Sequence, residues 1–147
     1  MFLNNKFSIF FFVPLALILG GLASSNTSTD IWYQSLLKSE LNPPGYVFGI
    51  VWPILYLLMS VSAYRTFKAT KNLFLIQLFF NTIWSWLFFS FHMPEVALLN
   101  IWLLIFINIK LLFQMTKIDK LSGIIYIPYV IWLAFASYLN LFIVINN

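Results

Sequence analysis

The sequence has no cysteine and very few charged residues. Lys and Arg number 8, Asp and Glu number 4, and together they make up 8% of the 147 residues. Without cysteine there is no disulfide framework, no thiolate nucleophile and no cysteine metal site. The only histidine, His92, stands in a proline-containing turn and does not favour a metal centre or an activated nucleophile. We therefore expect no metal site and no conventional catalytic residues.

Two further motif classes are missing. The chain has no glycine-rich phosphate loop, and no basic run is interleaved with aromatic residues. Nucleic acid is therefore not an expected partner.

All four acidic residues lie in connections or at the ends of apolar segments, namely Asp30, Glu40, Glu95 and Asp119. Because no apolar segment carries the buried acid that a proton-coupled transporter usually needs, a coupled pump is not expected either.

Apolar residues dominate what is present. Hydrophobic residues make up 62% of the chain, aromatic residues 20%, and the mean hydropathy is +0.92. A soluble domain of this size would be covered by exposed apolar patches. The composition therefore predicts an integral membrane protein whose surroundings are the lipid bilayer.

The apolar segments predict an all-α, single-domain bundle of five transmembrane helices. A membrane-spanning helix needs about 20 mostly apolar residues. Five segments meet this requirement, at about residues 7–23, 46–67, 73–91, 96–115 and 121–145. Three of the breaks are short and polar, which favours antiparallel neighbours: Lys68–Asn72, His92–Glu95 and Thr116–Lys120.

One connection is long. Residues 24–45 contain a Ser- and Thr-rich run, then Trp32-Tyr33, then Asn42-Pro43-Pro44-Gly45. This stretch is too amphipathic for a simple linker and too broken for another span. We expect it to form an extracytoplasmic loop that folds back over one end of the bundle and covers a pocket there.

The basic residues predict the orientation, because cytoplasmic connections carry an excess of Lys and Arg. With five alternating crossings, Lys38 falls on one side and the other seven fall on the opposite side: Lys6, Arg65, Lys68, Lys71, Lys110, Lys117 and Lys120. The N-terminus is therefore expected in the cytoplasm and the C-terminus outside. Residues 1–25 also have the features of a secretory signal peptide, but the charge alternation over five spans favours retention of this segment as the first span.

Polar and aromatic side chains recur on one face of the third expected span. Gln77, Asn81, Trp84 and Phe88 follow one another at spacings of four, three and four residues. An amide facing lipid would cost several kcal/mol, so this face is expected to point inward. Two interpretations remain open at this point: the amides bond neighbouring helices, or they line a cavity.

Further aromatic residues lie near the same end of the expected bundle. Trp52 and Tyr56 are one turn apart on the second span, and the fifth span carries Tyr129, Trp132, Ala136 and Asn140. Any one of these rings alone is typical of an interfacial anchor. Together with Trp32-Tyr33 in the long connection, they predict an aromatic pocket open toward the outer face, suited to a large, flat, mostly apolar ligand.

Several separated motifs, in one order over nearly the whole chain, make the sequence resemble the translocator protein family, also called TspO, MBR or tryptophan-rich sensory protein. They are Trp32-Tyr33, Asn42-Pro43-Pro44, Val51-Trp52, Leu55-Tyr56, the third-span set with Phe88-Phe89, Ala97-Leu98, Asp119, the run 126–135, and Leu139-Asn140.

The resemblance implies a five-helix membrane protein that binds porphyrin-type tetrapyrroles, such as protoporphyrin IX or heme-related molecules, and acts in tetrapyrrole regulation, transport or stress sensing. The porphyrin would be a ligand, and no cofactor is required. The implied ligand-binding residues are Trp32, Pro43, Pro44, Trp52, Tyr56, Asn81, Trp84, Phe88, Tyr129, Trp132, Ala136 and Asn140.

Two alternative functions stay open. Trp52 and Trp132 match tryptophans that, in bacterial relatives, are associated with light-dependent porphyrin breakdown. The chain is therefore either a binding protein or a light- and oxygen-dependent porphyrin-degrading enzyme. The other alternative is a passive transporter of porphyrins or sterols. The resemblance also leaves a homodimer open and agrees with a bacterial inner membrane location.

The sequence departs from the family pattern in two places. Animal members carry a cholesterol motif of Leu or Val, Tyr, and Lys or Arg near the C-terminus, whereas residues 139–147 lack both the tyrosine and the basic residue. Sterol recognition at that place is not expected. Family dimers form through small residues on a spanning helix, but the third span is rich in Phe and Trp, and we interpret Gly45 and Gly49 as the loop-to-helix junction of the second span.

Overall fold

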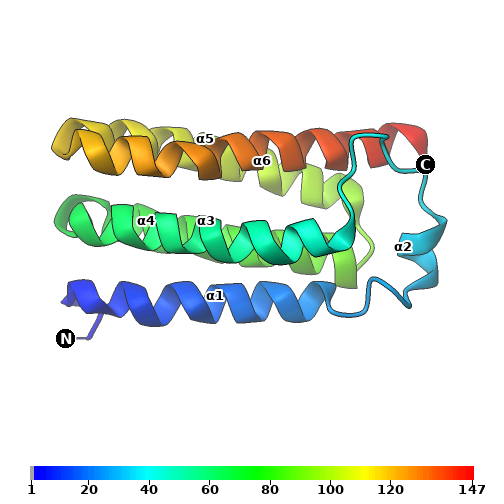
Figure 1. The fold of residues 1–147 in the computed structure, drawn as a ribbon, viewed down its shortest axis with the longest axis horizontal. Helices are drawn as coiled ribbons and strands as arrows, with labels where there is room; N and C mark the ends of the chain where they lie inside the picture. Colours follow the sequence, from blue (N-terminus) through cyan, green and yellow to red (C-terminus); the bar gives the residue numbers. More distant parts are fainter. Residues whose placement is uncertain (1) are drawn as a thin grey trace.

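The computed structural model describes residues 2–147, which are almost entirely helical. In chain order the elements are the 3₁₀ turns η1 (Phe2–Asn4) and η2 (Lys6–Ser8), α1 (Ile9–Ser24), α2 (Ile31–Ser35), α3 (Gly45–Arg65), α4 (Phe67–Ser85), the π-helical turn η3 (Trp86–Ser90), α5 (Pro94–Ile118) and α6 (Lys120–Asn146). Figure 1 shows the long helices side by side, with α2 beyond one end of the bundle. The predicted all-helical fold is confirmed.

Five helical stretches within the described residues are long and apolar enough to cross a membrane. They are Lys6–Ser24, Gly45–Arg65, Phe67–Ser90, Pro94–Ile118 and Lys120–Asn146. Each contains one of the five predicted spans or overlaps it closely. The chain is therefore an integral membrane protein with five spans.

Two predicted connections are wrong in extent. Residues 68–72 are helical, because α4 begins at Phe67 and only Thr66 departs from helical geometry after α3. Residues 116–118 continue α5, and Asp119 alone separates it from α6. These segments are polar but contain neither Gly nor Pro, so nothing in them interrupts the helical backbone.

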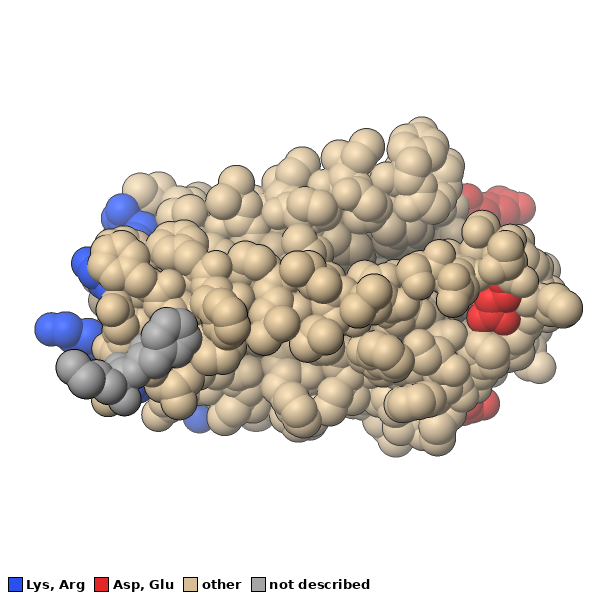
Figure 2. Space-filling view, turned by 90° about the horizontal axis from the view of Figure 1, so that it is seen from below, with Lys and Arg blue, Asp and Glu red and all other residues tan. Residues whose placement is uncertain are grey.

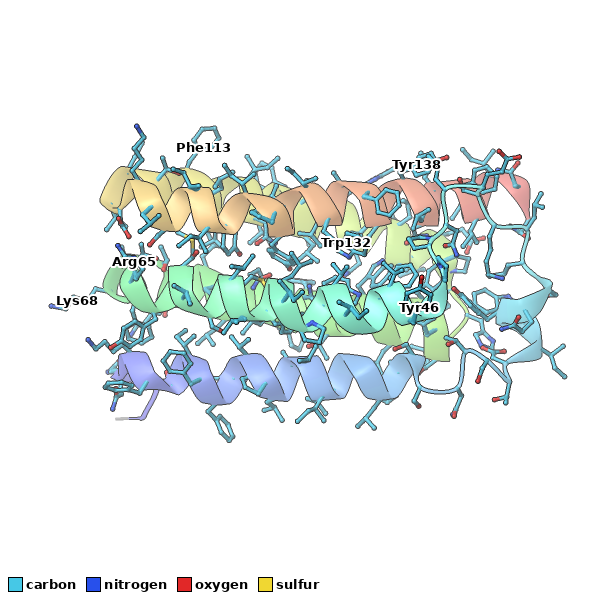
Figure 3. All side chains as sticks on the ribbon, viewed as in Figure 1. Tyr46, Arg65, Lys68, Phe113, Trp132 and Tyr138 are labelled. Atoms are coloured by element: carbon cyan, nitrogen blue, oxygen red, sulfur yellow. The ribbon has the colours of Figure 1, made fainter. Side chains whose placement is uncertain are left out.

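Bulky apolar side chains cover the outside of the bundle as well as its inside. Phe106 and Phe113 on α5 are 69% and 65% exposed, whereas Phe74, Tyr126 and Tyr129 are fully buried. Figure 3 shows Phe113 pointing away from the bundle. Lipid rather than water is the solvent that such a surface requires.

The charges separate along the long axis of the molecule. Figure 2 shows Lys and Arg side chains at one end and Asp and Glu side chains at the other. Asp119 belongs to the basic end, where its Oδ2 accepts from Arg65 Nε at 2.6 Å. This hydrogen bond, together with one from Ser122, lowers the pKa of the Asp119 carboxyl to about 2. The pair ties the end of α3 to the turn between α5 and α6.

The tight turn between α5 and α6 depends on Gly123. A Cβ atom built on Gly123 would lie 2.1 Å from Thr116 Oγ1 and 3.0 Å from Thr116 Cα. The second distance involves backbone, which cannot move aside as a side chain can. The two helices therefore approach one another more closely at this position than any side chain on Gly123 allows.

We expect Gly123→Ala to destabilise the protein by about 1–3 kcal/mol, because the added methyl group overpacks the α5–α6 contact. Thermal unfolding in detergent measures the effect. Gly21→Ala is the matched control, since a Cβ atom at Gly21 meets nothing within 4 Å. Adding Thr116→Ala to Gly123→Ala should recover only part of the loss, because the backbone contact remains. A Gly123→Ala variant as stable as the parent would show that the helices are not in such close contact.

Candidate ligand-binding cavity

A cavity of about 900 Å³ lies between the spans and is bordered by residues of the first connection, including Tyr33 and Gln34 of α2. Four helices and the loop supply its wall. The helical residues are Leu17, Gly20, Gly21 and Ser24 on α1; Gly45, Phe48, Gly49, Trp52, Pro53 and Tyr56 on α3; Asn81, Trp84 and Ser85 on α4, with Phe88 and Phe89 on η3; and Trp132, Ala136, Leu139, Asn140 and Ile143 on α6. The first connection, which includes α2, contributes Thr27, Ser28, Tyr33, Gln34, Lys38, Asn42, Pro43 and Pro44.

Most of the site residues predicted from the sequence lie on this one wall. They are Pro43, Pro44, Trp52, Tyr56, Asn81, Trp84, Phe88, Trp132, Ala136 and Asn140. Pro43 and Pro44 lie in the loop, where the family resemblance placed them. Helical spacing placed the other residues on inward faces, and the packing of α3, α4 and α6 brings those faces together. Whether each residue contacts a ligand stays a prediction.

Two predicted site residues do not form part of the cavity wall. Trp32 stacks on His92, with ring centroids 4.2 Å apart, and meets Phe88 edge-on at 6.0 Å. Tyr129 is fully buried and donates through its hydroxyl to Gln77 Oε1 at 2.7 Å. Trp32 belongs to the loop that covers the cavity. Tyr129 lies beneath the residues that line the cavity, so neither side chain forms part of the wall.

Tryptophan rings form the side walls. Trp52 on α3 meets Trp132 on α6 nearly edge-to-face, with centroids 6.4 Å apart, and Phe48 meets Trp132 at 5.9 Å. Trp84 stacks on Phe88 at 5.5 Å. Figure 3 shows Trp132 reaching from α6 toward α3. Within the described residues the buried Trp132 Nε1 has no hydrogen-bond partner, so packing alone holds this ring.

A chain of hydrogen bonds forms the floor. Tyr56 Oη donates to Asn81 Oδ1 at 2.5 Å, and Asn81 Nδ2 donates to Tyr129 Oη at 2.7 Å. Beneath them, Tyr126 Oη donates to Asn108 Oδ1 at 2.5 Å, and Asn108 Nδ2 lies 3.4 Å from Gln77 Oε1. The amides of the third span thus bond neighbouring helices, and Asn81 also lines the cavity.

The side chain of Asn140 also forms hydrogen bonds to neighbouring helices. Its Oδ1 accepts from Trp84 Nε1 at 3.1 Å, and its Nδ2 donates to the carbonyl of Pro94 at 2.8 Å. The side chain of Asn140 therefore fixes the Trp84 ring against α6 and ties α6 to the start of α5. A ring held at both its face and its N–H is a rigid surface for stacking.

Residues 25–44, here called the lid, cover the cavity. Asp30 Oδ1 accepts from Trp32 N at 3.0 Å and caps α2, while Asp30 Oδ2 lies 2.8 Å from His92 Nε2. His92 occupies the left-handed backbone region, with φ 53°, in the turn before α5. Ser39 Oγ lies 2.9 Å from Tyr138 Oη, and the Asn147 side chain bonds both backbone groups of Leu37. The lid is therefore tied to the bundle at three places.

Sequence reasoning missed these ties and several loop residues on the wall. Asp30 and His92 are 62 positions apart, and Leu37 and Asn147 are 110 apart, so no local pattern links them. Lys38 and Tyr33 also lie on the wall. Partial burial raises the pKa of the Tyr33 hydroxyl and lowers the pKa of the Lys38 ammonium, because water solvates both charged forms poorly there.

The family model described as TspO/MBR family matches residues 9–145. The chain belongs to the TspO/MBR family. Protein CrtK of Rhodobacter capsulatus is 33% identical over 146 residues, covering 91% of this chain and 88% of the relative. The tryptophan-rich sensory protein of Cereibacter sphaeroides is 34% identical, covering 76% and 73%. The human translocator protein is 29% identical, covering 74% and 70%.

In this TspO/MBR protein, we expect Asp30→Ala to loosen the lid. The substitution removes both the cap of α2 and the contact with His92, and a lost cap costs a helix about 0.5–2 kcal/mol. Hydrogen exchange at the amides of Ile31–Ser35 should accelerate roughly twofold to thirtyfold, which is that energy expressed as a rate ratio.

Asp30→Asn is the matched control for this prediction. Asparagine caps helices as well as aspartate does but lacks the charge that faces His92. Its exchange rates should lie between those of the parent and of Asp30→Ala. Identical exchange in all three proteins would contradict the role of Asp30 in holding α2.

Proposed function

We propose that the cavity binds a porphyrin-type tetrapyrrole, with protoporphyrin IX as the reference ligand. The observation that carries the proposal is the set of tryptophans Trp52, Trp84 and Trp132 around one cavity of about 900 Å³ beneath a lid. Small-molecule sites measure about 300–1,000 Å³, and flat apolar ligands gain most from aromatic faces. Membership of the TspO/MBR family supports the same ligand class through the resemblance described above.

The proposed role is capture of the tetrapyrrole for its regulation, transport or sensing. In this proposal the bound porphyrin is a ligand, and binding needs no cofactor. Asn81 contributes by ordering the floor, since Tyr56 and Tyr129 already engage its amide. The tryptophan walls then provide most of the contact area.

We expect protoporphyrin IX to quench the tryptophan fluorescence of the purified protein saturably in the dark. Replacing both Trp52 and Trp132 by Phe should weaken binding at least about tenfold, because two indole faces are lost from the wall. Trp102→Phe is the matched control, since Trp102 lies on α5 and is not part of the cavity wall. Saturable binding left intact by the double substitution would place the site elsewhere.

A second candidate function is light- and oxygen-dependent degradation of the bound porphyrin. The edge-to-face contact of Trp52 and Trp132 on the wall favours it, because both rings would touch a photoexcited ligand. Illumination of the titrated samples separates the two candidates. Loss of porphyrin absorbance no faster with protein than with detergent alone would remove the degrading enzyme and leave the binding protein.

We also propose that the basic end of the bundle faces the cytoplasm of a bacterial cell, with the lid outside the inner membrane. The separation of charges in Figure 2 supports this orientation, and the relatives in Rhodobacter and Cereibacter support the bacterial setting. The cavity would then open toward the outer side.

The absence of cysteine makes this orientation directly testable. We expect Glu40→Cys, in the lid, to react with a membrane-impermeant maleimide in intact cells. Lys117→Cys, at the opposite end of the bundle, should react only after lysis. Labelling with the reverse pattern would invert the proposed topology.

A further inference from the structure

The cavity is polar at its outer rim and aromatic toward its floor. The lid supplies Ser, Thr, Gln, Lys and Asn side chains to the wall. Trp52 and Tyr56 lie seven and eleven residues into α3, which at 1.5 Å per residue places them about 10 and 16 Å deeper. A ligand that matches both ends has an apolar body and polar groups along one edge.

Lys38 is the one charged side chain on this wall. No other Lys or Arg, and no Asp or Glu, lines the cavity among residues 2–147. The ion pairs of that part of the chain join Arg65 to Asp119 and His92 to Asp30, so Lys38 has no carboxylate partner in it. The nearby Glu40 is exposed and lies off the cavity wall. Lys38 therefore brings to the cavity wall a positive charge that no wall carboxylate balances.

The ammonium of Lys38 is held in place by the lid. Its Nζ donates to the carbonyl of Tyr33 at 2.6 Å and lies 3.4 Å from the carbonyl of Leu36. It also lies 4.4 Å from the centroid of the Tyr33 ring. An ammonium has three N–H donors, so one remains for a further acceptor. Partial burial lowers the pKa of the Lys38 ammonium.

We propose that Lys38 pairs with a carboxylate of the ligand at the cavity rim. The cavity then binds a flat apolar macrocycle with acid groups along one edge more tightly than the same macrocycle without those groups. This inference rests on the proposed function and names the chemical class within it. The carboxylate edge lies at the polar rim under the lid, and the apolar edge lies among the tryptophans. Protoporphyrin IX has this shape, with both propionates on one side of the ring.

A purely structural role for Lys38 makes a different prediction. The contacts with the carbonyls of Tyr33 and Leu36 also stabilise the end of α2, as basic side chains do at helix C-termini. Losing that role would weaken the binding of every ligand alike. Losing a carboxylate contact weakens the binding of acids alone.

The experiment compares protoporphyrin IX with its dimethyl ester, which has the same ring and no carboxylate. Fluorescence titrations in the dark give the dissociation constants for the parent, Lys38→Met and Lys38→Arg. The parent should bind the acid about tenfold or more tightly than the ester, as expected for one charged contact in a partly buried site. Lys38→Met should erase this preference while leaving the ester affinity within about twofold, since the ester makes no charged contact.

Two controls isolate the position and the charge. Lys38→Arg keeps the charge and should retain most of the preference for the acid. Lys117→Met removes one positive charge at the opposite end of the bundle and should leave both affinities unchanged. In the parent protein, high ionic strength should weaken binding of the acid and not of the ester, a test that needs no substitution.

The outcomes separate this inference from the proposed function. Equal affinity of the parent for acid and ester, or an equal loss for both in Lys38→Met, overturns the carboxylate contact and leaves porphyrin binding in place. Failure of both ligands to bind the parent overturns the proposed function, and the inference with it. A lasting preference for the acid in Lys38→Met assigns the contact to another residue and also overturns it.

Discussion

Hydrogen bonding of buried amides and phenols in a hydrocarbon environment is the constraint on which this bundle depends. Asn81, Gln77 and Asn108 lie among the spans with almost no exposure. Each would be costly there if it were unpaired, and each bonds a tyrosine or another amide instead. Because the bonds to tyrosines and other amides join different helices, the requirement to satisfy these groups also fixes how α3, α4, α5 and α6 stand relative to one another.

The cavity exists because the helices above that polar layer carry residues of very different size. Gly20, Gly21 and Gly49 present no side chain to it, and Ala136 presents a single methyl group, whereas Trp52, Trp84 and Trp132 stand around them. Small residues at such positions would normally let neighbouring backbones close on one another. The Trp84 ring, which Asn140 and the stacked Phe88 hold in place, keeps the helices from closing on one another here. The lid covers the space that remains.

The sequence alone was sufficient for the spans and for the inward faces of the helices that surround the cavity. Apolar length sets the spans, and spacing at three and four residues sets the face, so Asn81, Trp84 and Phe88 were placed correctly on the wall. Depth and long-range pairing carry no such periodic signal. Tyr129 was therefore named among the residues that contact the ligand, although it lies below the wall. Trp32 was expected in the covering loop and lies there, but its stacking on His92 has no signal in the sequence. Lys38 was interpreted only as a topology signal, because nothing local shows that the lid places it on the cavity wall.

Helix α6 contributes residues to the layer beneath the floor of the cavity, to the wall and to the contacts with the lid. Tyr129 lies beneath the floor, Trp132 and Ala136 form part of the wall, and Tyr138 bonds the lid, as does Asn147 directly after the helix. The residues that would touch a ligand and the residues that hold the lid therefore share one continuous helix. A ligand that displaces Trp132 would act on the same helix that anchors the lid.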